Sequence, residues 1–177
     1  MKTRLIATFA AALFAVPAAA AEPLSEAVSG DWLVATFKSL CFDPFGDRAK
    51  LTRAIAQSDA AFTSVTDDPT LPVPGLSKWQ STKATLAYTD GALLPKPLPS
   101  PQCSLTGTPA ADYDHAATAS ALAGAVGLLP AKPKGKNGRF SSEWNFAGPK
   151  GEKRRLFLSQ ESTPGGASVR ISLLNLR

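Results

Sequence analysis

The chain has 177 residues, among them 19 Lys and Arg, 14 Asp and Glu, one His and two Cys, and its formal net charge is +5. This length suits one domain of ordinary size, and the proportions of apolar (44%) and charged (19%) residues exclude wholesale disorder. One His and two Cys are too few for a zinc site that takes four such ligands. We therefore predict neither a metal nor a cofactor.

Residues 1–21 have the pattern of a secretory signal peptide. A short basic start precedes the apolar run 5–16, and Pro17 ends that run. Small residues follow, as signal peptidase requires, and we predict cleavage between Ala21 and Glu22. The predicted destination is the periplasm or the extracellular medium.

The predicted mature chain, residues 22–177, carries 17 Lys and Arg against 14 Asp and Glu, a net charge of +3. It contains no stretch that is long and apolar enough for a membrane helix. We therefore expect a soluble protein with no transmembrane segment, folded as a single domain.

Cys41 and Cys103 both lie in the predicted mature chain. Two cysteines in an oxidising compartment are expected to pair, so we predict a Cys41–Cys103 disulfide. The two residues are 62 positions apart, and closing a loop of that length stabilises a fold by about 4 kcal/mol. A redox-active pair would have the Cys-x-x-Cys spacing, which these two residues lack.

Three segments have the apolar periodicity of amphipathic helices: residues 32–42, 48–62 and 113–128. Side chains that can cap their N-termini precede them: Asp31, Asp47 and Asp112. Their predicted inward stripes comprise Leu33, Phe37, Leu40 and Cys41; Leu51, Ala54, Ile55, Ser58 and Phe62; and His115, Ala119, Leu122, Val126 and Leu129.

The pattern of apolar and polar residues predicts five strands: residues 79–89, 102–106, 139–147, 153–159 and 167–177. Tight turns join the last three, which is typical of an antiparallel meander. The order α-α-β-β-α-β-β-β predicts an α+β fold in which the helices pack on one face of an antiparallel sheet. The disulfide would join the first helix to the first pair of strands.

The sequence lacks the Gly-x-Ser-x-Gly elbow, the phosphate-binding Gly-rich loop, the His-Glu-x-x-His helix and the Gly-x-Gly-x-x-Gly turn. A Ser–His–Asp triad could only use His115 as its base, with Asp112 or Asp114 to orient the ring. We therefore assign no catalytic residue and favour a protein that is not an enzyme. A small hydrolase with a site near His115 is an alternative hypothesis.

Charge is distributed unevenly along the mature chain. Residues 22–127 carry 7 Lys and Arg against 11 Asp and Glu, whereas residues 128–177 carry 10 against 3. In a C-terminal meander, the alternation places Arg139, Arg155 and Arg170 on the outer face, and the turns add lysines at the rim. The predicted surface for an anionic partner comprises Arg139, Lys150, Lys153, Arg154, Arg155 and Arg170. The same residues could instead form a solvated face that keeps the sheet from aggregating.

These features favour an exported, non-catalytic binding or accessory protein whose basic sheet face attracts an anionic protein or an envelope component. Nucleic acid is disfavoured because an exported protein meets little of it, and because Phe140, Trp144 and Phe146 have the spacing of core residues. A further alternative is a protein inhibitor or immunity-type partner that would insert its proline-rich segments, 69–78 and 95–101.

Overall fold

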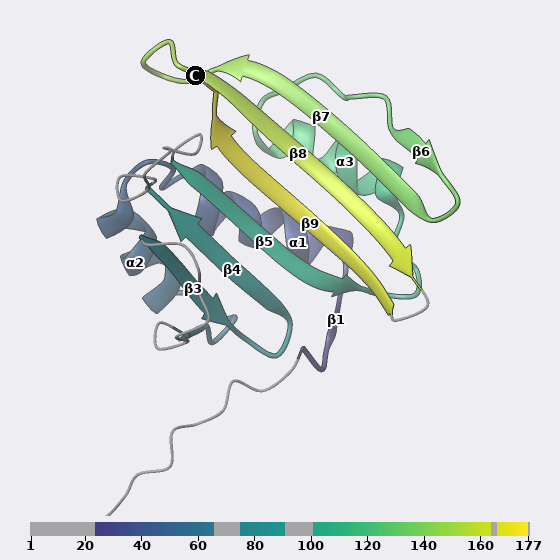
Figure 1. Ribbon diagram of the computed structural model, residues 1–177, viewed down its shortest axis with the longest axis horizontal. Helices are drawn as coiled ribbons and strands as arrows, with labels where there is room; N and C mark the ends of the chain where they lie inside the picture. Colours follow the sequence, from purple (N-terminus) through teal and green to yellow (C-terminus); the bar gives the residue numbers. More distant parts are fainter. Residues whose placement is uncertain (1–23, 66–74, 91–100, 164–165, 177) are drawn as a thin grey trace, which may run out of the picture.

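The computed structural model describes residues 24–65, 75–90, 101–163 and 166–176, which form a layer of strands and a layer of helices (Figure 1). The strands are β1 (Ala27–Val28), β2 (Thr63–Ser64), β3 (Leu76–Gln80), β4 (Ala84–Thr89), β5 (Gln102–Pro109), β6 (Lys134–Lys136), β7 (Arg139–Ala147), β8 (Lys153–Thr163) and β9 (Gly166–Asn175). The helical elements are α1 (Gly30–Phe37), a π-helical turn (Lys38–Phe42), α2 (Arg48–Ala56) and α3 (His115–Ala125). The predicted signal peptide and most of both proline-rich segments lie outside the described residues.

The described strands form one sheet in the order β2-β3-β4-β5-β9-β8-β7-β6, and β1 adds to β5 in parallel. The other neighbours are antiparallel, and the predicted C-terminal meander is confirmed as β7, β8 and β9. Asn137 and Gly138 connect β6 to β7 with positive φ angles of 54° and 75°. A two-residue hairpin turn requires such angles, and Asn and Gly adopt them at the least cost.

Side-chain caps start the first two helices. Ser29, not the predicted Asp31, caps α1, because its Oγ accepts the N–H of Trp32 at 3.3 Å. Asp47 caps α2 as predicted, and its carboxylate accepts the N–H of Lys50 at 2.9 Å. Each such cap satisfies an N–H group that the first helical turn leaves without an intrahelical partner.

The cap of α3 differs from the expected one. Asp114 caps this helix, not Asp112, because its carboxylate accepts the N–H groups of Ala116 and Ala117 at 2.7 and 3.0 Å. The helix therefore begins at His115, and the predicted first two residues precede it. The Asp114 carboxylate is therefore hydrogen-bonded to the backbone of its own helix.

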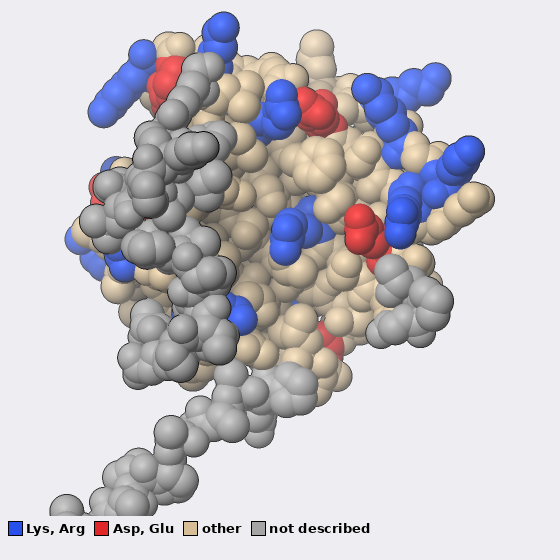
Figure 2. Space-filling model, in the orientation of Figure 1, with Lys and Arg blue, Asp and Glu red and all other residues tan. Residues whose placement is uncertain are grey.

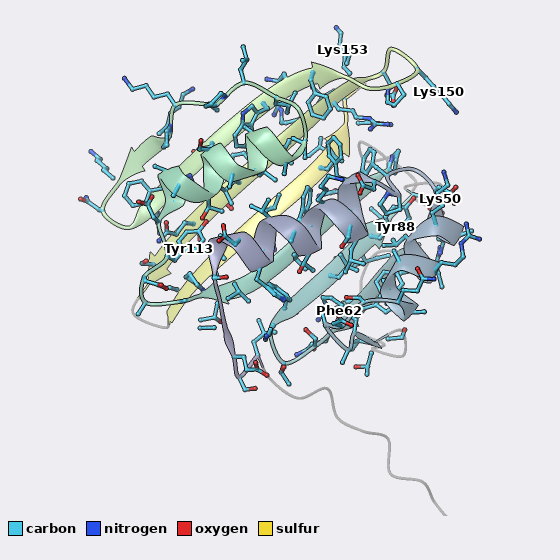
Figure 3. The ribbon with its side chains drawn as sticks, turned by 180° about the vertical axis from the view of Figure 1, so that it is seen from behind. Lys50, Phe62, Tyr88, Tyr113, Lys150 and Lys153 are labelled. Atoms are coloured by element: carbon cyan, nitrogen blue, oxygen red, sulfur yellow. A yellow bond between two sulfur atoms is a disulfide. The ribbon has the colours of Figure 1, made fainter. Side chains whose placement is uncertain are left out.

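Helices α1 and α3 cross the same face of the sheet, and α2 lies beside them at the β3–β4 end (Figure 3). This confirms the predicted α+β architecture. Each buried aliphatic side chain contributes roughly 1.5–3 kcal/mol, so packing between the layers stabilises helices that would be too short to form alone. The largest fully buried side chains are Phe37, Leu33, Leu40, Leu51, Leu86, Leu105, Leu122, Leu156, Leu158, Ile171, Leu173 and Val28.

The predicted disulfide is present between Cys41, in the π-helical turn, and Cys103, in β5. Their Cα atoms are 5.5 Å apart, and each residue is 1% exposed. The bridge therefore crosses the core and links the helix layer to a central strand of the sheet.

The prediction of one strand over 79–89 is wrong, because this segment contributes to two strands, β3 and β4, that pair as a hairpin. Ser81 makes the turn: its Oγ accepts the N–H groups of Lys83 and Ala84 at 3.3 and 3.1 Å. Residues 81–83 contain no Gly, Pro, Asn or Asp, and a serine hydroxyl is a weaker sequence signal for a turn than these residues are.

Two helices end earlier than predicted. α2 ends at Ala56, and Thr63–Ser64 pairs with β3 as strand β2. α3 ends at Ala125, so the predicted stripe does not reach Leu129, which is 86% exposed. No helix in the described part of the chain is long and apolar enough to cross a membrane.

Candidate functional site

The two faces of the sheet have different neighbours. Side chains alternate along each strand, and one set, which includes Leu156, Leu158 and Ile171, is buried under the helices. The other set lies on the face turned to the viewer in Figure 1, which no described helix covers. We call this second face the open face.

The open face carries a groove with a volume of about 700 Å³. Four cations line it: Lys134 on β6, Arg139 on β7, Arg155 on β8 and Arg170 on β9. Figure 2 shows basic side chains spread over the half of this face that belongs to β6–β9, with carboxylates between them. The three arginines that the alternation assigned to one outer face therefore lie in a common groove.

The pairing register aligns several groove residues in one row across the sheet. Arg170 lies opposite Ser159, Ser159 opposite Ser141, and Ser141 opposite Lys134. Neighbouring strands are about 4.8 Å apart, so the row places two hydroxyls between two cations whose backbones are roughly 14 Å apart. Arg139 lies two residues from Ser141 along β7, which is about 7 Å.

The cations of the groove differ in how far they are neutralised. Arg155 pairs with Glu143 at 3.0 Å, and its Nε also donates to the Asn145 Oδ1 at 3.2 Å. The paired side chains are 42% and 41% exposed, so this ion pair contributes only about 0–1 kcal/mol and a ligand carboxylate can displace it. Arg139 and Arg170 form no ion pair with any described residue.

Arg170 is held in place without being neutralised. Its Nε donates to the Thr106 Oγ1, on the neighbouring strand β5, at 3.1 Å. Because Thr106 carries no charge, the guanidinium keeps its full positive charge and its remaining N–H groups for a ligand. This combination is typical of a side chain that is oriented for an anion.

Most of the remaining lining residues are polar, and Phe140, Phe157 and Leu174 are the large apolar ones. Hydroxyls and amides of Gln102, Ser141, Ser159 and Ser172 lie along the groove, and Phe157 is half-buried in it. Two carboxylates, those of Glu143 and Glu161, also line it. Four cations and two carboxylates leave the groove with a net positive charge, which favours an anionic ligand.

Three of the predicted surface residues lie elsewhere. Lys150 and Lys153 extend from the turn and strand end at one end of the molecule (Figure 3) and do not line the groove. Arg154 points to the helix side, where its guanidinium forms an ion pair with Glu152 and lies 4.8 Å from the ring centroid of Phe45. Its side chain is only 11% exposed, so Arg154 does not share a face with the groove cations.

His115 lies on the opposite side of the sheet from the groove. Its Nε2 is 3.2 Å from the Ser142 Oγ, and both residues are buried. Its Nδ1 has no hydrogen-bond partner, and neither Asp112 nor Asp114 orients the ring, because Asp114 caps α3. The triad that the sequence allowed is therefore not assembled.

Burial lowers the pKa of His115, and the Asp114 carboxylate opposes this shift with a smaller effect. The ring is therefore neutral near pH 7, and its contact with Ser142 is a hydrogen bond inside the core. The described residues contain no group of three or more His, Cys, Asp or Glu side chains that could hold a metal ion.

Residues that we did not single out from the sequence complete the groove: Phe157, the serines of the cross-strand row, Gln102 and both carboxylates. Phe157 and Ser159 could have been predicted from the alternation of β8, because they lie two and four residues after Arg155 and therefore point to the same face. Their alignment with β7 and β9 depends on the register, which a single strand does not encode.

Comparison of the chain with models of protein families, with curated protein sequences and with solved structures found no match.

Proposed function

We propose that this protein is exported and acts, without catalysing a reaction, by binding an anionic partner on the open face of the sheet. The observation that carries the proposal is the groove in which Arg139 and Arg170 keep unneutralised charges beside hydroxyls and amides. Export is supported by the signal-peptide pattern of residues 1–21 and agrees with the Cys41–Cys103 disulfide.

The position of the arginines favours binding over protection from aggregation. Proteins place charges against aggregation mainly on the edge strands of a sheet, where unpaired backbone groups attract other chains. Arg155 and Arg170 instead lie on β8 and β9, which are paired on both sides. The groove also has the volume of small-ligand sites, which is about 300–1,000 Å³.

The binding proposal is tested with two double variants that remove equal charge. Arg139→Gln/Arg170→Gln alters the groove, and Lys50→Gln/Arg53→Gln alters exposed residues of α2. Binding of fluorescent polyglutamate, polygalacturonate and single-stranded DNA is measured by anisotropy at low salt. Charge-assisted hydrogen bonds contribute about 1.5–3 kcal/mol each, so the first variant should bind at least one probe about tenfold or more weakly than the wild type. Equal affinities of the two variants for every probe would refute the proposal.

The export proposal has its own test. The full chain is expressed in a bacterial host, and the protein is recovered from the periplasm or the medium. Mass spectrometry should find a chain that begins at Glu22 and carries no free thiol. Recovery of the uncleaved chain from the cytoplasm alone would contradict export and leave the binding proposal unaffected.

A further inference from the structure

We infer that the ligand of the groove is an acidic oligosaccharide, a short chain of sugar rings that carry carboxylates. The inference rests on the proposed function, because it uses the same open face and names the ligand class. It follows from three properties of the lining: its hydroxyls and amides, the ring of Phe157 and the separation of its cations.

The hydroxyls and amides match the exterior of a sugar. Ser141 and Ser159 lie side by side in the cross-strand row, and Ser172 and Gln102 extend the polar lining across β9 and β5. Serine hydroxyls and amide groups both donate and accept hydrogen bonds, as sugar hydroxyls do. An extended peptide is recognised through backbone groups at the edge of a sheet, and the open face offers side chains instead.

Phe157 supplies an apolar platform. The register places it between Ser172 on β9 and Glu143 on β7, so its ring lies among polar neighbours in the β6–β9 half of the open face. One face of a sugar ring presents C–H bonds, which suit the negative face of an aromatic ring. Sequence-tolerant binding of single-stranded nucleic acid uses several such rings. Phe157 is the only aromatic residue that the alternation places on this face among the described strands. Phe140 also borders the groove, but it has the opposite phase on β7 and its ring lies 5.8 Å from the His115 ring.

The cations are separated, which suits carboxylates spaced along a chain. Arg170 and Arg139 lie on strands that are two positions apart in the sheet, with β8 between them. Glu161 lies opposite Arg139, and Glu143 pairs with Arg155, so carboxylates are interspersed with the cations. A densely charged polyphosphate would meet these carboxylates, whereas a chain with one charge on each sugar can align its charges with the arginines.

The test measures binding of trigalacturonate by titration calorimetry at low salt, with its neutral methyl ester as the matched probe. The wild type should bind the acid about tenfold or more tightly than the ester. Arg170→Gln should weaken binding of the acid about tenfold, and Arg53→Gln, which removes an exposed arginine of α2, should not change it. Phe157→Leu should weaken binding of the acid about two- to tenfold. Phe157→Tyr keeps the flat ring and should bind the acid as tightly as the wild type does. Thermal unfolding of each variant verifies that the sheet is intact.

The outcomes separate this inference from the proposed function. If the wild type binds acid and ester equally, or if Arg170→Gln and Arg53→Gln bind the acid equally, the inference of an acidic oligosaccharide is overturned. A different result would be that polyglutamate or single-stranded DNA binds in a way that depends on Arg139 and Arg170, while trigalacturonate does not bind. That result overturns the oligosaccharide inference and supports the proposal of an anionic partner. Failure of all the anionic probes to distinguish the groove variants from the α2 variants overturns both.

Discussion

The Nε2 of His115, at the start of α3, lies 3.2 Å from the Oγ of Ser142 in the middle of β7. The two residues are only 6% and 2% exposed, and the ring of Phe140 lies 5.8 Å from the His115 ring. This hydrogen bond joins the helix layer to the strand that carries Arg139. It is the one hydrogen bond of the imidazole, because Nδ1 has no partner in the described structure.

Replacing Ser142 by Ala should destabilise the protein. The substitution leaves both nitrogens of the buried His115 ring without a partner, which costs about 1–3 kcal/mol. Urea denaturation should therefore show a lower free energy of unfolding. Ser141→Ala, one position along β7 and on the open face, is the control and should stay within about 0.5 kcal/mol of the wild type. Equal effects of the two substitutions would contradict this account.

The free energy of unfolding should fall as the pH is lowered below about 6.5, the ordinary pKa of histidine. Burial lowers the pKa of His115 in the folded chain, so the unfolded chain binds the proton more readily and acid favours unfolding. The loss is complete once the pH is below the lowered pKa, and its slope is at most about 1.4 kcal/mol per pH unit.

Urea denaturation between about pH 5 and pH 7.5 measures this dependence. The chain has a single His, so His115→Gln should remove the histidine contribution altogether. If the wild type and His115→Gln have the same pH dependence in this range, His115 is not the responsible group.

Removing the disulfide should lower the free energy of unfolding by about 4 kcal/mol, because the bridge restricts a loop that spans 62 positions in the unfolded chain. The suitable variant is Cys41→Ala/Cys103→Ala, since both positions are buried and a serine hydroxyl would lack a partner there. Reducing agent should destabilise the wild type and leave the double variant unchanged. A wild type that is insensitive to reduction and unfolds at the same urea concentration as the variant would refute the prediction.

Gly30→Ala should destabilise the protein although Ala favours helices by about 1 kcal/mol. An added Cβ would collide with the Thr118 Oγ1, which is fixed by donating to the Asp114 carbonyl at 2.7 Å. Overpacking of this kind costs about 1–3 kcal/mol.

A double-mutant cycle checks that interpretation. Gly30→Ala combined with Thr118→Ala should be more stable than the sum of the two single effects predicts. A stabilising Gly30→Ala, or additive effects, would show that the close contact between α1 and α3 is not the cause.

The elements that could be predicted are those in which local periodicity and turn residues agree. Strand β7 has the bounds expected from its alternation, Arg139–Ala147, and a Gly-Pro turn follows it. The same alternation predicts that Arg139, Arg155 and Arg170 share one face. Arg154 is adjacent to Lys153 and Arg155 in the sequence but lies on the other face of the sheet, because neighbouring residues of a strand point to opposite faces.

Other features depend on contacts between distant segments. β1 and β2 have two residues each and exist only because β5 and β3 pair with them. The groove likewise depends on the register that aligns Ser141, Ser159 and Arg170, which come from three strands. Such pairings are set by the packing of the whole sheet, and no window of the sequence contains them.

The disulfide and the sheet order together determine when the groove can exist during synthesis. Both cysteines precede β6–β9, so the bridge can hold β5 in place before the second half of the sheet has been made. The last strand, β9, pairs with both β5 and β8, so the surface that places Arg170 beside Ser159 needs the C-terminal strand. A chain that ended before Gly166 would contain both cysteines but would lack Arg170, Ser172 and Leu174, and with them one side of the groove.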